Sequence, residues 1–173
     1  MNKLILLFAK LGNSTVKRVI YTKYLGVRIG DNVRFTGSPD FGSEPYLISI
    51  GSNVTITQNV TFHTHDGGLS VLRKKYPRIN KYGRITIGDN VFIGSGVMIM
   101  PNVDIGDNVI IAAGSIVTKS VSSDSVVGGV PAKLLKTIQQ YERDVISRND
   151  HIIMPEGLEG KAKEKFIIDS LKK

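Results

Sequence analysis

Residues 85–121 read ITIGDN VFIGSG VMIMPN VDIGDN VIIAAG SIVTKS V, and this six-residue repeat decides the fold. An apolar residue recurs at every sixth position without a break: Ile87, Ile93, Ile99, Ile105, Ile111 and Val117. A second apolar residue follows four positions later in each repeat except at Ser115. The same phase is present at Ile29 and again from Ile50 to Phe62. This period is neither that of a helix nor the alternation of an ordinary strand.

The composition of each repeat predicts a short strand followed by a tight turn. Ile and Val suit a pleated strand, whereas Gly and Asn supply the unusual backbone angles that a tight turn needs. The pentapeptide Ile-Gly-Asp-Asn-Val occurs at 29–33, 87–91 and 105–109, and the last two copies are 18 residues apart. Three repeats would therefore complete one circuit of a three-sided solenoid, and stacked circuits would bury a ladder of Ile and Val. We expect an all-β solenoid over residues 29–130.

Two segments interrupt the repeat. Residues 36–49 contain Pro and Gly and lose the phase, so we expect the chain to bulge there. Residues 68–86 form a longer excursion, which we expect to leave the solenoid as an extruded loop and then rejoin it. Because loops on a rigid scaffold commonly carry function, this loop is a candidate part of a functional site.

The two ends of the chain carry helical patterns instead of the repeat. Residues 1–28 place apolar side chains on two stripes, one from Leu4 to Leu11 and one made of Val16, Val19, Ile20 and Tyr24. This segment is either a helix packed on its own domain or an amphipathic segment lying on an anionic membrane. Its longest apolar run is too short to span a bilayer.

The C-terminal segment, residues 131–173, is expected to begin with a second amphipathic helix. Pro131 suits the first position of a helix, and an apolar stripe follows it. The stripe consists of Leu134, Leu135, Ile138, Tyr141 and Val145. Residues 149–173 are charged and weakly patterned, which fits either a short helix on the solenoid or a partly ordered tail.

Charge and cysteine content restrict the chemistry. The chain of 173 residues has no Cys and a net charge of +8. Without Cys there is no disulfide scaffold, no Cys-ligated metal and no covalent thioester on the protein. Residues 1–28 and 73–84 carry six basic residues each and no acid, whereas the remainder has an acidic excess. We therefore expect no general nucleic-acid face, only two local basic segments.

These motifs resemble those of the hexapeptide-repeat acyltransferases. The resemblance covers residues 29–138 and rests on the repeats, on GSIVTK (114–119) and on GGVPAK (128–133). Its nearest branch is that of the maltose, galactoside and polysaccharide O-acetyltransferases. It implies a left-handed parallel β-helix with flanking helices, a homotrimer with active sites between subunits, and acetyl-coenzyme A as the donor. The left hand comes from the resemblance alone, because parallel crossovers are generally right-handed.

Two of the three histidines lie beside the loop, in FHTHDGG (62–68). A sugar hydroxyl that attacks a thioester needs a base able to take its proton near neutral pH, a task that imidazole suits. His65 matches the Thr-His pattern that the resembled family has before its loop, which implies that His65 is the catalytic base. His63 is the alternative. Asp66 is a candidate for orienting one of the histidines, although a backbone carbonyl could do so equally.

The resemblance also implies where the donor binds. The Ser95 amide would contact the acyl end, the next positions would follow the pantetheine arm, and two lysines at the start of the expected C-terminal helix would meet the phosphates. The implied donor contacts are Ser95, Ala113, Thr118, Lys119, Lys133 and Lys136. No metal is expected, and direct transfer in a ternary complex follows from the lack of Cys.

The leading hypothesis is an acetyl-coenzyme A-dependent O-acetyltransferase of a sugar, in surface polysaccharide or lipopolysaccharide synthesis, located in the cytoplasm or at the membrane face. N-acetylation of a nucleotide-linked amino sugar is a second enzymatic hypothesis, and a non-catalytic scaffold is a third. A zinc carbonic anhydrase on the same solenoid needs three histidine ligands, but the repeats supply only His63 and His65, and His151 lies in the tail.

Overall fold

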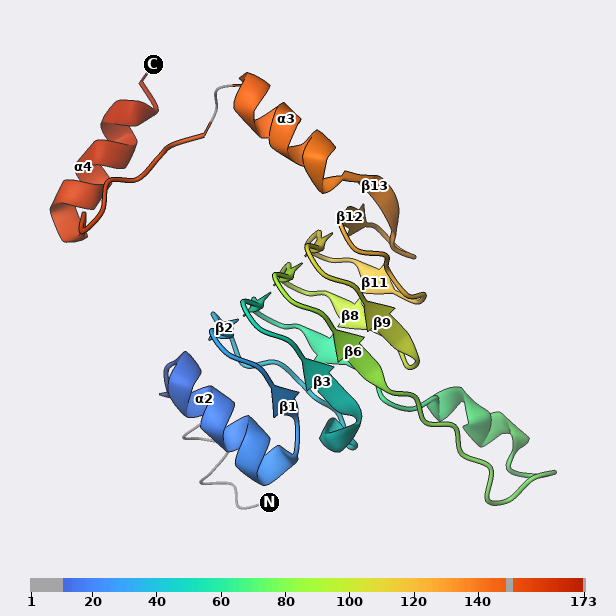
Figure 1. The fold of residues 1–173 in the computed structure, drawn as a ribbon. Helices are drawn as coiled ribbons and strands as arrows, with labels where there is room; N and C mark the ends of the chain where they lie inside the picture. Colours follow the sequence, from blue (N-terminus) through green and yellow to red (C-terminus); the bar gives the residue numbers. More distant parts are fainter. Residues whose placement is uncertain (1–10, 149–150, 173) are drawn as a thin grey trace. The chain divides into compact units, whose positions relative to one another are not determined.

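The computed structural model describes residues 11–148 and 151–172, which fall into two compact units that divide after Ile138 (Figure 1). The first unit is built from three sheets of short strands, and their pairing is parallel everywhere except between β12 and β13. The first sheet contains β1 (Arg28–Ile29), β3 (Ile48–Ile50), β6 (Ile85–Ile87) and β9 (Val103–Ile105). The second contains β2 (Arg34–Phe35), β4 (Thr55–Ile56), β7 (Phe92–Ile93), β10 (Ile110–Ile111), β12 (Ser125–Gly128) and β13 (Lys133–Thr137). The third contains β5 (Thr61–Phe62), β8 (Met98–Ile99) and β11 (Ile116–Val117).

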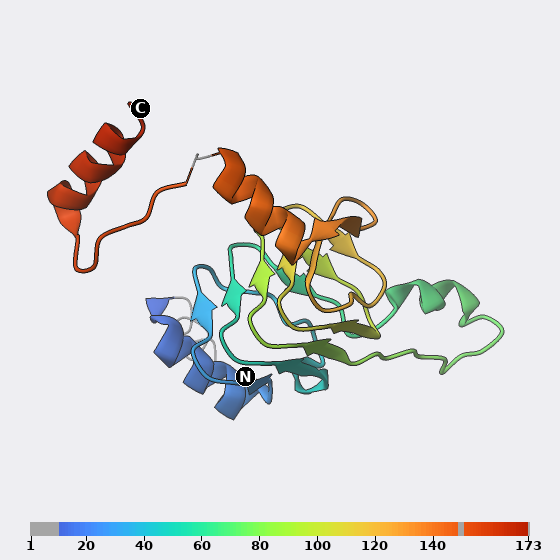
Figure 2. The same cartoon turned by 45° about the horizontal axis from the view of Figure 1, so that its top comes forward.

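The chain visits the three sheets in turn and then returns to the first, as Figures 1 and 2 show. Ile87 pairs with Ile105, and the adjacent Asp89 donates its amide to Asp107, a separation of 18 residues. The parallel sheets and the circuit of three repeats are therefore confirmed. The first apolar position of each repeat points inward, because Ile56, Ile93 and Ile111 are completely buried.

Ser115, the polar exception in the repeat, is also completely buried. Its hydroxyl donates to the carbonyl oxygen of Ala112 at 2.6 Å and accepts from the amide of Gly129 at 3.1 Å. A buried hydroxyl with both partners satisfied carries little penalty, which explains why a serine occupies an inward position.

Asparagines make the turns between strands. Six of them, together with Asp124, adopt a positive φ. They are Asn32, Asn53, Asn59, Asn90, Asn102 and Asn108. Some of their side chains also bond between circuits, as where the amide of Asn90 donates to Asn108 Oδ1 at 2.8 Å. The glycine of the pentapeptide has another purpose: a Cβ on Gly88 would lie 2.8 Å from the backbone carbon of Gly106. Glycine there lets successive circuits stack closely.

The two predicted interruptions differ in size. The circuit containing residues 36–49 has three extra residues, so Asp31 lies 21 residues before its neighbour Ser52. A 3₁₀ turn, Pro45–Leu47, absorbs them. The longer excursion begins with a 3₁₀ helix, Gly67–Leu72, and stands out from the sheets in Figures 1 and 2. We call residues 67–82 the arm.

The N-terminal helix packs on the first circuits with a different face from the one predicted. Helix α2 (Ser14–Ile20) continues as a π-helical turn, Tyr21–Leu25. Lys17, Ile20 and Tyr21 are buried, whereas Val16, Val19 and Tyr24 are exposed, so the predicted stripe is wrong apart from Ile20. The aromatic ring of Tyr21 fills the space at the end of the core, and the Lys17 ammonium donates to Gly37 O at 2.7 Å while its alkyl stem is buried. The other stripe, Leu4 to Leu11, lies outside the described residues except for Leu11, which is exposed.

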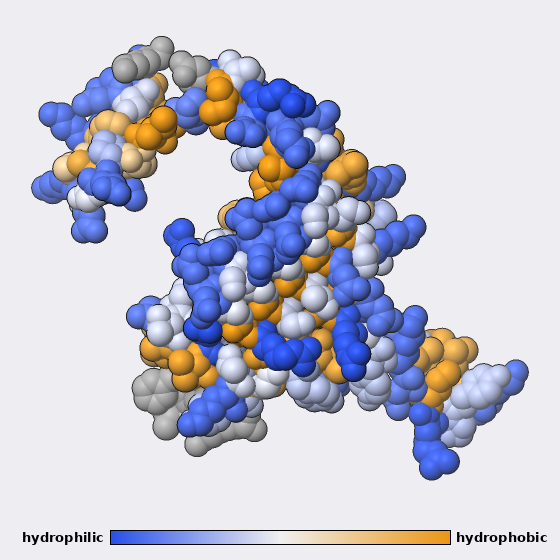
Figure 3. Space-filling model, in the orientation of Figure 1, coloured by the Kyte–Doolittle hydropathy of each residue, from blue (hydrophilic) through white to orange (hydrophobic). Residues whose placement is uncertain are grey.

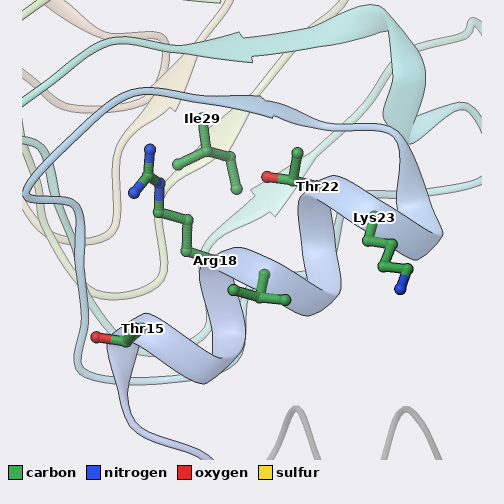
Figure 4. A pocket seen from close by; sticks show the side chains of 6 residues that line it. Thr15, Arg18, Thr22, Lys23 and Ile29 are labelled. Carbon is green, nitrogen blue, oxygen red and sulfur yellow. The ribbon is translucent and has the colours of Figure 1, made fainter.

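A shallow pocket of about 290 Å³ lies between this helix and β1 (Figure 4). Thr15, Arg18, Thr22 and Lys23 line it from the helix, together with Ile29 from β1. Arg18 forms an ion pair with Asp31 at 2.8 Å. That ion pair ties the helix to the first turn of the sheets.

The predicted helix from Pro131 is wrong over its first turns. Residues 133–137 form β13, which pairs antiparallel with β12. Gly129, at φ +99°, stands between the two strands, and β13 covers the edge of the second sheet. Helix α3 begins only at Ile138 and ends at Arg148.

The second unit contains α3 from its second residue, Gln139, onward, together with α4 (Gly160–Ser170). Of the residues expected to form either a short helix on the solenoid or a partly ordered tail, Gly160–Ser170 form helix α4. Among the helices that the structure describes, none combines the length and apolar composition needed to cross a bilayer.

Candidate active site

The histidine pair lies where the chain leaves the sheets. The amide of His63 donates to Ile99 O at 2.8 Å and so prolongs the third sheet by one residue. His65 pairs antiparallel with Tyr82 at the other end of the arm. On either side of that pair the Gly83 amide donates to Thr64 O at 2.8 Å and the Asp66 amide donates to Lys81 O at 3.0 Å. Backbone hydrogen bonds therefore fix His65 at the base of the arm.

Glu44 holds the ring of His65. Its Oε2 atom lies 2.9 Å from His65 Nδ1 and accepts a 2.7 Å hydrogen bond from the hydroxyl of Thr64, a buried residue. The Thr64 hydroxyl is the main reason why the pKa of Glu44 lies below its ordinary value, and the neighbouring His65 lowers that pKa further, whereas burial opposes both. Because an ionised carboxylate only accepts hydrogen bonds, the neutral imidazole carries its proton on Nδ1 and leaves Nε2 as the basic nitrogen.

The carboxylate beside the histidine is not the one that the sequence suggested. Asp66 Oδ1 accepts from the amide of Gly68 at 2.9 Å and caps the 3₁₀ helix of the arm. Glu44 lies 21 residues before His65 in the sequence, one circuit earlier. The lost phase of residues 36–49 is the sequence feature that bears on Glu44, but the offset of 21 residues instead of 18 is seen only in the structure.

Two clefts flank His65. One, of about 320 Å³, is polar and lined by Ser43, Glu44, His65, Asp66, Gly67, Arg73, Asn80, Lys81 and Tyr82. The other, of about 300 Å³, is lined by His63, His65, Asp66, Gly67, Lys81, Met100 and Pro101. The structure therefore brings the three residues predicted around the base, His63, His65 and Asp66, into one neighbourhood.

Four of the six implied donor contacts lie at two corners of the sheets. Ser95 lies in the turn before β8, where its hydroxyl donates to Thr57 Oγ1 at 3.1 Å and its carbonyl accepts from Gly114 at 2.8 Å. Ala113 occupies the same corner one circuit on. Thr118 and Lys119 follow β11 at the other end of the third sheet, the end where His63 stands. Within one chain, Ser95 and His65 thus lie at different corners.

The two lysines predicted to meet the phosphates are on a strand and not at a helix start. Lys133 pairs in register with Gly128, and Lys136 pairs with Val126. Because both lysines belong to β13, no helix N-terminus assists them in binding a phosphate.

No group of three or more His, Asp or Glu side chains within the described ranges, 11–148 and 151–172, is arranged to hold a metal ion. The chain has no Cys to add to such a group.

Comparison with known proteins identifies the family. Residues 84–119 match the bacterial transferase hexapeptide family (six repeats). The chain is 53% identical over 129 residues to protein CapG of Staphylococcus aureus, and the alignment covers 73% of this chain and 75% of that protein. It is 36% identical over 139 residues to the galactoside O-acetyltransferase of Escherichia coli (strain K12), covering 79% of this chain and 68% of that one. The solved structure of a galactoside acetyltransferase in complex with coenzyme A superposes with a TM-score of 0.61 at 28% identity, over 89% of this chain and 84% of that chain. The chain belongs to the hexapeptide-repeat acetyltransferases.

Proposed function

We propose that this protein transfers an acetyl group from acetyl-coenzyme A to a sugar hydroxyl, with His65 as the general base. The observation that carries the proposal is the 2.9 Å contact between His65 Nδ1 and Glu44, which leaves the other ring nitrogen available between two clefts. Similarity to a galactoside O-acetyltransferase, and to a solved relative that holds coenzyme A, supports the acceptor and donor classes. The acceptor is proposed to belong to a surface polysaccharide or lipopolysaccharide.

The transfer needs one base and no covalent intermediate on the protein. Nε2 of His65 takes the proton of the acceptor hydroxyl as its oxygen attacks the acetyl carbonyl carbon. The resulting imidazolium, with Nδ1–H donating to Glu44, is stabilised by that carboxylate. When the C–S bond breaks, the proton returns from Nε2 to the coenzyme's sulfur. The products are the acetyl ester and the free thiol.

The donor is proposed to bind where the resemblance implies. The Ser95 amide would stabilise the oxyanion, and Ala113, Thr118 and Lys119 would contact the pantetheine arm. Lys133 and Lys136 would meet the phosphates as cationic side chains of a strand. These are the donor contacts that mutagenesis should address first.

We also propose a left-handed parallel β-helix that assembles as a homotrimer with its sites between subunits. One observation supports a shared site: Ser95 precedes β8, whereas the histidines stand at the opposite end of the third sheet. A second copy that brought its Ser95 corner against the first copy's His65 corner would complete the site. Sedimentation of the purified protein at several concentrations tests for the trimer.

The experiment that tests the function follows free thiol released from acetyl-coenzyme A with a panel of mono- and oligosaccharide acceptors. His65→Ala is expected to lower kcat/KM by about 100-fold or more, the usual range for loss of a general base. His151→Ala is the matched control and should retain transfer within about threefold, whereas His63→Ala tests the alternative base. Circular dichroism verifies that each variant is folded.

Two outcomes would contradict the proposal. If His65→Ala transferred acetyl groups at the wild-type rate to an acceptor confirmed by mass spectrometry, His65 would not be the base. If His63→Ala alone abolished transfer, the base would be His63, which lines the second cleft.

A further inference from the structure

The arm carries cations without acids. Between residues 67 and 82 the sequence has five basic residues and no Asp or Glu. They are Arg73, Lys74, Lys75, Arg78 and Lys81. Figure 3 shows hydrophilic side chains over much of the arm, beside an apolar patch. Val71 and Leu72, also in the arm, are exposed. Of the five cations, only Arg73 and Lys81 line the clefts beside His65.

The structure holds the side chain of Arg73 and the backbone of Lys81 in position. One guanidinium nitrogen of Arg73 donates to Asn80 Oδ1 at 3.2 Å, and the amide of Asn80 donates in turn to Arg78 O at 3.1 Å. The carbonyl of Lys81 accepts from the amide of Asp66, one residue from the pairing of Tyr82 with His65. Lys81 accordingly lines both clefts.

The carboxylates of the clefts already have partners. Glu44 accepts from Thr64 and contacts His65, and Asp66 accepts from Gly68. Within residues 11–148 and 151–172 no carboxylate forms an ion pair with Arg73 or Lys81. The two cations therefore present charge and hydrogen-bond donors to whatever enters the cleft.

We propose that Arg73 and Lys81 bind an anionic group on the acceptor saccharide, a phosphate or a carboxylate, and so place its hydroxyl against His65. This inference rests on the proposed function and names its substrate class. A guanidinium can bind a phosphate or carboxylate with two parallel hydrogen bonds, and an ammonium adds a compact charge. A neutral sugar carries no charge for either cation to neutralise.

The kinetic test compares three acceptors: glucose 1-phosphate, galacturonate and methyl glucoside. Arg73→Gln and Lys81→Met should each raise KM for the charged acceptors by about tenfold or more, with little change in KM for methyl glucoside. Lys74→Gln is the matched control, because Lys74 is exposed on the same arm and lines neither cleft. Raising the salt from about 50 mM to about 500 mM should weaken only the charged acceptors. The two charged acceptors distinguish a phosphate from a carboxylate.

A second measurement separates this inference from the proposed function. Calorimetric titration of glucose 1-phosphate and of galacturonate into wild type, Arg73→Gln and Lys74→Gln needs no turnover. The anion site is supported if Arg73→Gln weakens this binding and Lys74→Gln preserves it. If that result is obtained but no acceptor is acetylated, the proposed function fails while the anion site is retained. The inference is overturned if methyl glucoside is acetylated as well as the charged acceptors, or if Arg73→Gln and Lys81→Met leave charged-acceptor KM and binding unchanged.

Discussion

The Nδ1 atom of His65 lies 2.9 Å from Oε2 of Glu44, although 21 residues separate them in sequence. The stacking of one circuit on the next makes this contact, and Thr64 secures it by donating to the same oxygen. Glu44→Gln keeps the shape of the side chain but removes the charge that stabilises the imidazolium. We expect kcat/KM to fall about 10- to 100-fold, because the imidazolium that forms during transfer loses its counter-charge.

Ser43→Ala is the control for that experiment. Its hydroxyl lies 3.5 Å from the same nitrogen, at the limit of a hydrogen bond, so its loss should change kcat/KM less than about threefold. A Glu44→Gln enzyme with a wild-type rate would show that the carboxylate does not assist the base.

The hydroxyl of Thr64 makes stability depend on pH. The pKa of Glu44 is lowered from the ordinary 4.5, first by the Thr64 hydrogen bond and then by His65. The stabilisation is therefore fully present above that ordinary value and is lost as the pH falls through the lowered one. Thr64→Val should cost about 1 to 2 kcal/mol near neutral pH, and the cost should shrink at lower pH.

Thermal unfolding of wild type and Thr64→Val across a pH series measures this difference. Thr55→Val is the reference, since Thr55 pairs across its sheet with Arg34 and Phe92 and no carboxylate stands among these partners. A Thr64→Val deficit that stays constant from neutral to acidic pH would exclude the coupling to Glu44.

The sequence predicted the sheets because their cause is local and repeated. An Ile at every sixth position and an Asn at positive φ act in the same way in each circuit, so many weak signals agree. The arm followed because the six-residue phase is lost over residues 68–86, whereas His65 was singled out by the resemblance alone. Glu44 could not be found in the same way: its position relative to His65 depends on three extra residues in one circuit. The repeat does not specify how many extra residues a bulge contains.

The helical ends show a second limit. Leu134 and Leu135 fit a helical stripe, but they lie in β13 because the open edge of the second sheet takes up their backbone groups. In α2 an apolar stripe was predicted, yet Lys17 is buried in place of Val16. A hydrophobic pattern specifies which residues are apolar, whereas the available partner surface specifies which face is covered.

The contribution of the stacked asparagines to stability has a conformational part and a hydrogen-bonding part, and two substitutions should separate them. Asn108 has φ +55°, accepts from Asn90 at 2.8 Å and donates to Asp124 at 3.0 Å. Asn108→Gly removes both hydrogen bonds but tolerates the positive φ, so it should cost about 1 to 2 kcal/mol. Asn108→Ala adds about 1 kcal/mol or more of backbone strain. Denaturant unfolding of the two variants measures the difference, and an alanine variant as stable as the glycine variant would refute the strain.

Tyr21 should be the residue through which the N-terminal helix is fastened to the sheets. It is 3% exposed, and its ring meets the edges of Phe35 and Phe41 at centroid distances of 5.4 and 5.0 Å. Phe41 is stacked in turn on Phe62 of β5 at 5.3 Å. Tyr21→Ala should therefore cost about 3 to 5 kcal/mol, through lost burial and the cavity left behind.

Tyr24, three residues on, provides the comparison. It is 49% exposed, so Tyr24→Ala should change stability by less than about 0.5 kcal/mol. Tyr21→Phe keeps the ring and should retain most of the stability. Hydrogen exchange of Ser14–Leu25 adds a local readout: in Tyr21→Ala these amides should exchange faster than those of β7 and β10, which lie in the middle of the second sheet. Equal acceleration in all of them would mean that Tyr21 supports the whole stack of circuits and not the attachment of the helix.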